Sequence, residues 1–121
     1  MEPSLITGMG VVSAIGLGKA QTLEALLANR SGVGEPKYLK TEHKEFPVGE
    51  VKLSDAEMRE RLGIPQDVVT TRTALMGMLA LGEALEEAQL TQDMLPKVGF
   101  ISGMKAATTR RAVISDARVT S

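Results

Sequence analysis

The sequence has 121 residues, of which 43% are hydrophobic and 24% charged, with a formal net charge of -1. This length fits one domain or part of one, and the composition is that of a globular protein and not of a disordered tail. The balanced charge gives no electrostatic basis for binding nucleic acid or an anionic membrane. Cysteine is absent and His43 is the single histidine, which excludes disulfides, thiolate zinc sites and a cysteine nucleophile from this chain.

The N-terminus lacks the pattern of a secretory signal peptide, because Glu2 and Pro3 stand where such a peptide carries positive charge. The most apolar segment, residues 73–85, is too short to span a bilayer and contains Glu83. We therefore expect a soluble, cytoplasmic protein.

The chain is organised around residues 5–18, where a short apolar run meets Gly8 and Gly10. An apolar run closed by glycine predicts a buried strand over residues 5–9, followed by a tight turn. Glycine suits positions where the backbone takes a positive φ or passes close to another segment.

Residues 19–29 are rich in helix formers and predict an amphipathic helix. Leu23, Leu26 and Leu27 stand three and four positions apart, so they form one apolar stripe. Asn29, Ser31 and Gly32 follow, and they provide the end of this helix.

An irregular excursion follows up to residue 53. Residues 46–51 predict a short strand, which Pro47 and Gly49 confine to an edge or an irregular ribbon. Ser54 and Glu57 then form a capping-box pattern, which begins a short helix that extends to residue 62.

The longest predicted helix is capped by Thr70 or Thr71 and covers residues 72–90. Its first half is apolar on nearly every face, which predicts burial on all sides, and its second half is amphipathic. Residues 97–103 predict a second strand that ends in glycine. The order of strand, helices and strand predicts an α/β fold with a largely parallel sheet.

The glycine pair resembles part of a phosphate-binding motif, but its context differs from that of a dinucleotide site. Such a site needs a second strand about 20 residues further on that ends in an acidic residue. At that distance the sequence has the helix end and a loop, and Glu35 precedes a proline. We therefore interpret Gly8 and Gly10 as structural.

The remaining polar candidates do not combine into a catalytic constellation. His43 lies in a polar loop, and Glu83, Glu86 and Glu87 have the spacing of a solvated helix face. The basic pair Arg110-Arg111 has no aromatic platform beside it, which argues against nucleic-acid binding. The serines that could serve as nucleophiles, none of them in a Gly-x-Ser-x-Gly elbow, are Ser13, Ser31 and Ser102. The sequence thus predicts no catalytic, cofactor-binding or metal-binding residue in this chain.

Taken in order, these blocks resemble the β-ketoacyl-acyl-carrier-protein synthases, condensing enzymes of the thiolase-fold superfamily. The resemblance begins with LITGMGVVSAIG at residues 5–16 and continues with LEALLANRSGV at residues 23–33. The later blocks are FPVGEV at residues 46–51, residues 72–88, and VGFISG at residues 98–103.

The resemblance implies a partial thiolase-like fold over residues 1–103, followed by an atypical tail at 104–121. It implies a place among the acyltransferases of fatty acid or polyketide synthesis, which perform a decarboxylating Claisen condensation on acyl carrier protein and acyl thioesters. The family's cysteine nucleophile and its two histidines lie beyond the matched blocks, so no catalytic residue carries over. A truncated chain, a frameshifted reading or a divergent remnant would each explain the atypical tail and the absence of the family's catalytic residues.

Three functions follow as hypotheses. The first is an N-terminal scaffold portion of a condensing enzyme, inactive alone. The second is a non-catalytic interaction module that pairs with another chain or self-associates, because unpaired strand edges favour association. The third is a small dinucleotide-binding domain that uses Gly8 and Gly10.

Overall fold

The computed structural model describes residues 2–103, and the statements below concern that part of the chain. The described residues fall into two units, which divide between Gln89 and Leu90. The predicted tail at 104–121 lies outside the described residues, and the domain boundary after residue 103 stays a prediction.

The first unit begins with a β-hairpin. Strands β1 (Val12–Ser13) and β2 (Gly16–Leu17) pair antiparallel, with Val12 opposite Leu17. The tight turn therefore lies between these strands, several residues after the predicted position at Gly8 and Gly10. The two glycines have a different role, which is described with the candidate site.

Helix α1 (Lys19–Leu27) follows the hairpin directly. Its N-cap is Gly18, whose φ of 97° is a conformation that glycine adopts without a steric penalty. The helix ends near the predicted position, where Asn29 takes the left-handed conformation with a φ of 54°. The prediction of this helix is confirmed.

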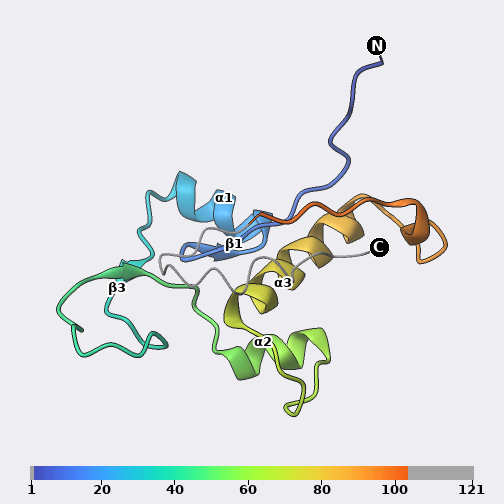
Figure 1. Cartoon of the computed structure of the whole chain (residues 1–121). Coiled ribbons are helices and arrows are strands. Elements are labelled where there is room, and N and C mark those ends of the chain that lie inside the picture. The colour runs from blue at the N-terminus through green and yellow to red at the C-terminus, as the bar shows by residue number, and fades with distance from the viewer. Residues whose placement is uncertain (1, 104–121) are drawn as a thin grey trace. The chain divides into compact units, whose positions relative to one another are not determined.

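The excursion contains a second short ribbon. Strand β3 (Val33–Gly34) pairs antiparallel with β4 (Val48–Gly49), so the prediction of a short edge strand in residues 46–51 is confirmed. The loop that joins these strands extends away from the helices (Figure 1).

Helix α2 (Asp55–Leu62) has the predicted ends. The Ser54 hydroxyl accepts a hydrogen bond of 3.1 Å from the Glu57 amide, and Gly63 ends the helix in the left-handed conformation with a φ of 70°. Serine at this position satisfies an amide that the helix leaves unpaired.

Helix α3 (Arg72–Glu87) is capped by Thr71, whose hydroxyl accepts from the Ala74 amide at 3.1 Å. The predicted burial on all sides is wrong for this structure, because Leu75 is the buried residue of the helix and Met78 is 37% exposed. The described part of the first unit covers only one side of α3.

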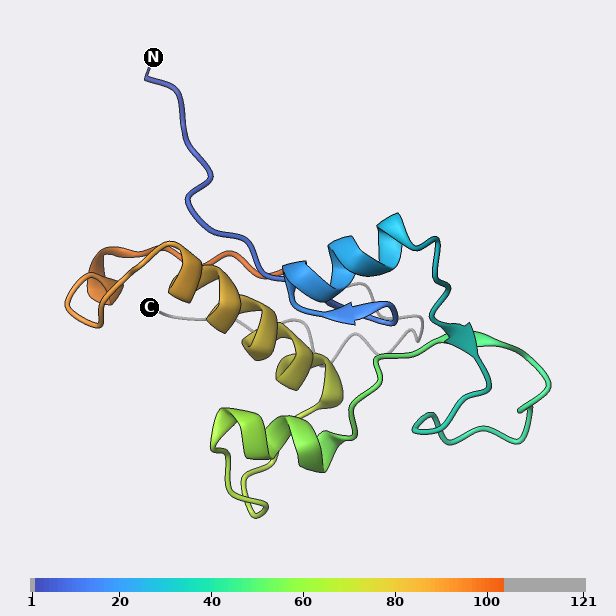
Figure 2. The ribbon, with the colours of Figure 1, turned by 180° about the vertical axis from the view of Figure 1, so that it is seen from behind.

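The helices of the first unit and its first hairpin pack in the spatial order α1, β2, β1, α3 and α2. Helix α1 contacts β2, β1 contacts α3, and α3 contacts α2, an arrangement that both ribbon views show (Figures 1 and 2). A small hydrophobic core lies where α2 and α3 meet the preceding loop, and its buried members are Val51, Leu53, Met58 and Leu75.

The second unit contains a short 3-10 helix, η1 (Leu95–Lys97), with proline in its first turn. The strand predicted over residues 97–103 does not form, and Ile101 is 98% exposed. The strand predicted over residues 5–9 is likewise absent. A strand needs a neighbour to receive its hydrogen bonds, and the described residues offer neither segment a partner.

The fold class is therefore confirmed only in its coarser form. The described residues form a small α/β arrangement of short antiparallel strand pairs and three α-helices. The predicted parallel sheet is not found among them.

Candidate functional site

Gly8 and Gly10 lie against the C-terminal half of α3. A side chain at Gly8 would collide with the backbone of Ala84 and Ala88, and one at Gly10 would collide with the backbone of Ala80. The interpretation of these glycines as structural is therefore supported, and their role is close backbone approach to a helix that carries alanine at the contact positions.

The Glu83 carboxylate ties the hairpin to α3. Its Oε1 atom accepts a hydrogen bond of 2.9 Å from the Val11 amide, and its Oε2 atom accepts one of 2.9 Å from the Lys19 amide. The Lys19 ammonium also forms an ion pair with Glu87. The prediction that Glu83 belongs to a solvated helix face is wrong, because its carboxylate accepts these two backbone amides, whereas Glu86 and Glu87 are exposed as predicted.

This contact also bears on the dinucleotide hypothesis. The Lys19 amide opens α1, and amides at the first turn of a helix are the groups that bind phosphate in nucleotide sites. Here that amide and the Val11 amide already donate to the protein's own carboxylate. A phosphate would have to displace Glu83, so the geometry gives the dinucleotide hypothesis no support.

A second carboxylate, Glu50, organises the excursion loop. It accepts hydrogen bonds from the amides of Lys37 at 2.8 Å, Tyr38 at 3.1 Å and Leu39 at 2.8 Å. The Lys37 amide contributes most to holding the pKa of Glu50 below its ordinary value, and the positive charge of Arg72 acts in the same direction. Bonds to the ionised form always favour that form.

Arg72 connects this loop to the start of both later helices. Its guanidinium donates to Asp55 at 2.8 Å and to the Val51 carbonyl at 2.9 Å, and it lies 4.9 Å from the centre of the Tyr38 ring. Side-chain contacts of this kind fix the position of a loop. None of them presents a reactive group to a substrate.

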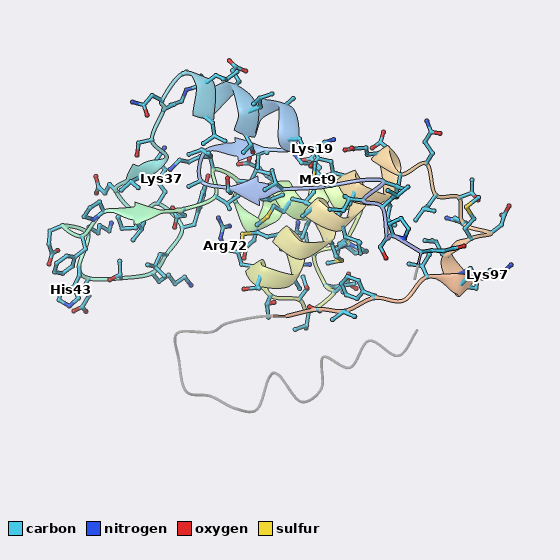
Figure 3. All side chains as sticks on the ribbon, turned by 90° about the horizontal axis from the view of Figure 1, so that it is seen from above. Met9, Lys19, Lys37, His43, Arg72 and Lys97 are labelled. Atoms are coloured by element: carbon cyan, nitrogen blue, oxygen red, sulfur yellow. The ribbon has the colours of Figure 1, made fainter. Side chains whose placement is uncertain are left out.

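His43 has the solvated position that the sequence predicts. It lies in the loop between β3 and β4, where its Nδ1 atom is 3.2 Å from Glu45 Oε1 and both side chains are exposed. Figure 3 shows His43 at the far end of this loop, away from Met9 and Lys19. No serine in the described residues is hydrogen-bonded to it.

The serine hydroxyls have local structural roles. Ser13 accepts from the Ile15 amide at 3.4 Å, Ser31 accepts from the Val33 amide at 3.2 Å, and Ser102 is exposed. Arg110 and Arg111 lie outside the described residues. The structure thus brings none of the sequence candidates together into a nucleophile and base pair within residues 2–103.

An apolar groove lies between the N-terminal segment and α1 on the surface of the first unit. It has a volume of about 530 Å³. The residues that line it are Met9, Val11, Lys19, Ala20, Thr22, Leu23 and Leu26. Figure 3 shows Met9 and Lys19 at this place, where the chain enters α1. The groove carries few groups that could perform chemistry, and it is suited to apolar contact.

Within residues 2–103 no group of three or more His, Cys, Asp or Glu side chains is placed to hold a metal ion. None of the described helices has the length and apolar character needed to cross a membrane.

Sequence reasoning missed the roles of Glu83 and Glu50. For Glu83 a signal was present, because this acidic residue stands in an otherwise apolar stretch, residues 79–85. A charge in such a position requires a partner. The partners are backbone amides, which no sequence pattern identifies.

The chain is similar to proteins named 3-oxoacyl-[acyl-carrier-protein] synthase 1 from several bacteria. The protein of Haemophilus influenzae is 26% identical over 118 residues, which are 95% of this chain and 28% of that protein. The protein of Buchnera aphidicola is 29% identical over 114 residues, or 91% of this chain and 28% of that protein. The protein of Escherichia coli K12 is 28% identical over 114 residues, which cover 91% of this chain and 27% of that protein.

The chain therefore spans less than a third of the length of these relatives. Because the first match includes 95% of the chain, it extends past residue 103, further than the blocks that carry the resemblance in the sequence. No family model matches this chain. The search of solved structures likewise returned no match.

Proposed function

We propose that this chain is the N-terminal scaffold portion of a condensing enzyme similar to 3-oxoacyl-[acyl-carrier-protein] synthase 1, with a partial thiolase-like fold. The observation that carries the proposal is the similarity to three such synthases over nine-tenths or more of this chain, confined to less than a third of theirs. The sequence resemblance in residues 5–103 points to the same family.

In this proposal the chain supplies structure and not reacting groups. The condensation joins an acyl thioester to a malonyl unit with loss of carbon dioxide, and in the family it uses a cysteine and two histidines. This chain has no cysteine, and its one histidine lies in an exposed loop. Acyl carrier protein and acyl thioesters are then partners of the whole enzyme, which acts in the cytoplasm in fatty acid or polyketide synthesis.

The scaffold role agrees with how the polar groups of the first unit are used. Glu83 holds the hairpin against α3, and Glu50 and Arg72 hold the excursion loop. Each of these side chains is committed to backbone or side-chain partners within the chain. They support positions of segments, which is what a scaffold has to do.

The proposal is tested by a chimera. The part of the Escherichia coli synthase that matches this chain is replaced by this chain, and condensation with malonyl-acyl carrier protein is measured. We expect the chimera to be active and this chain alone to be inactive. Acyl transfer to the chain alone, or a folded chimera without activity, would contradict the proposal.

A second candidate function, an interaction module, is favoured by one observation, the exposed apolar groove beside α1. An apolar surface of this kind on a soluble protein marks an interaction site. Sedimentation of the pure chain distinguishes the two, because a module that pairs with itself gives a stable dimer and a scaffold portion does not.

A further inference from the structure

A second pocket of the first unit lies where the hairpin turn, the end of α1 and the segment before α2 meet. Residues 13–17, Gln21, residues 30–32 and Lys52 line it, and its volume is about 230 Å³. It shares no lining residue with the apolar groove beside α1. We name it the basic pocket, for the charges described next.

The charged residues that line the basic pocket are both positive. They are Arg30 and Lys52, and none of the described lining residues is acidic. The Lys52 ammonium donates to the Gly32 carbonyl at 2.8 Å, which holds this charge beside the pocket. Arg30 lies 3.6 Å from Glu24, but the two side chains are 56% and 71% exposed. An exposed pair at this distance contributes little, so the guanidinium can still bind an anion.

Uncharged side chains add hydrogen-bond donors to the pocket. Ser13, Ser31 and Gln21 each accept a hydrogen bond from a backbone amide of the same segment, at 3.4, 3.2 and 2.9 Å. The side-chain oxygen is the acceptor in all three bonds. This leaves the two hydroxyl hydrogens and the amide NH2 group as donors.

Close packing at two glycines fixes the walls of the basic pocket. A side chain at Gly32 would collide with the backbone of Ala14, and one at Gly16 would collide with the backbone of Gln21 and Thr22. The hairpin turn therefore contacts both α1 and the turn that follows it. Because these segments are already in place, binding does not have to bring them together, which lowers the entropic cost of binding.

We infer that the basic pocket binds a phosphate group, either as inorganic phosphate or as the end of a phosphomonoester. A phosphate offers several acceptor oxygens and a double negative charge, which match a pocket that combines two cations with neutral donors. A cavity that holds one water has a volume of only ~10–15 Å³, so the basic pocket has room for this group. It contains neither Gly8 nor Gly10, and the inference does not depend on the proposed function.

Titration of the full 121-residue chain, followed by NMR of its backbone amides, tests the inference. Inorganic phosphate and glycerol 3-phosphate are added in separate experiments at constant ionic strength, and sodium chloride alone gives the effect of salt. We expect saturable shifts of the Ser31 and Gly32 amides with one or both phosphates and none with chloride. Tighter binding of inorganic phosphate identifies the free ion as the ligand, and tighter binding of glycerol 3-phosphate identifies a phosphomonoester.

Matched variants locate the binding. Arg30→Gln and Lys52→Gln each remove one charge from the basic pocket, and Lys40→Gln removes the same charge from the excursion loop, which does not line it. Ser31→Ala removes a donor without a change of charge. All four side chains are exposed, so each variant should keep the circular dichroism and melting profile of the parent chain.

We expect Arg30→Gln and Lys52→Gln to raise the dissociation constant by about tenfold or more, because each loses a bond between charged groups. Ser31→Ala should raise it by about twofold to tenfold, and Lys40→Gln by less than about twofold. Equal weakening by all three charge variants would overturn the inference, since the ion would then respond to overall charge alone. Shifts that do not saturate, shifts that chloride reproduces, or unchanged affinity in Arg30→Gln and Lys52→Gln would overturn it as well.

Discussion

Replacing Glu83 should loosen the hairpin and the start of α1 together. The carboxylate accepts from the amides of Val11 and Lys19, both at 2.9 Å and both partly buried. A hydrogen bond to a charged group contributes about 1.5–3 kcal/mol. Because Glu83 accepts two such bonds, Glu83→Ala should lower the free energy of unfolding by ~3 kcal/mol at the lower end of that range. Glu83→Gln keeps one acceptor oxygen but turns an amide donor toward the second backbone amide. Glu83→Gln should therefore lower the free energy of unfolding by at least about half as much as Glu83→Ala does.

Urea denaturation of the full chain measures the loss, and hydrogen exchange at Val11 and Lys19 locates it. Both amides should exchange faster in Glu83→Ala, while the amides of α2 change less. Glu86→Ala is the matched control, because Glu86 is exposed on the same helix and should change the free energy of unfolding by no more than ~0.5 kcal/mol. Equal effects of the two alanine variants would refute this account of how the hairpin is held.

Further predictions concern the glycine contact, the excursion loop and the core. Gly10→Ala should destabilise the chain by at least ~2 kcal/mol in urea denaturation, because its new methyl group meets the backbone of α3. Gly77→Ala is the control: a methyl group there meets nothing within 4 Å, so this variant should stabilise the chain by about 0.5–1 kcal/mol. Stability changes of the same sign in both variants would contradict the close approach of Gly10 to α3. The lowered pKa of Glu50 means that its contribution to loop stability is present above the ordinary carboxyl pKa of about 4.3 and is lost as the pH falls through the lower pKa of the folded state. Amide exchange in residues 37–39, followed by NMR on acidification, should show this loss in the parent chain and a much weaker pH dependence in Glu50→Gln; identical pH profiles would show that Glu50 does not hold the loop. Met58→Ala should lower the free energy of unfolding by about 2–5 kcal/mol, because Met58 is fully buried, and Met78→Ala should cost less than ~1 kcal/mol at its 37% exposed position; a comparable cost for both would argue against the small core described here.

Local signals in the sequence predicted the helices well. Ser54 and Gly63 mark the ends of α2 because a hydroxyl cap and a left-handed glycine act within one turn of the chain. Thr71 begins α3 for the same reason. These effects depend on neighbouring residues alone, so a sequence pattern contains all the information they need.

Strands and sites depend on partners that lie far away in the chain. Residues 5–9 have the composition of a buried strand, but a strand forms only when another strand receives its hydrogen bonds, and the described residues supply none. Glu83 lies 72 positions from the Val11 amide that it binds, and no periodicity predicts that contact. The hydrophobic pattern was thus informative about what this chain would bury, and the exposed face of α1 shows where the cover is absent from the described residues.

The central claim is that this chain can act as the scaffold of a condensing site. It is tested most directly by the rate at which the chimera elongates an acyl thioester with malonyl-acyl carrier protein. We predict a rate at least about 1% of that of the parent synthase, equivalent to a loss of no more than ~2.7 kcal/mol of transition-state stabilisation. A chimera that melts cooperatively but elongates no faster than the same chimera with its nucleophilic cysteine changed to alanine would contradict the claim.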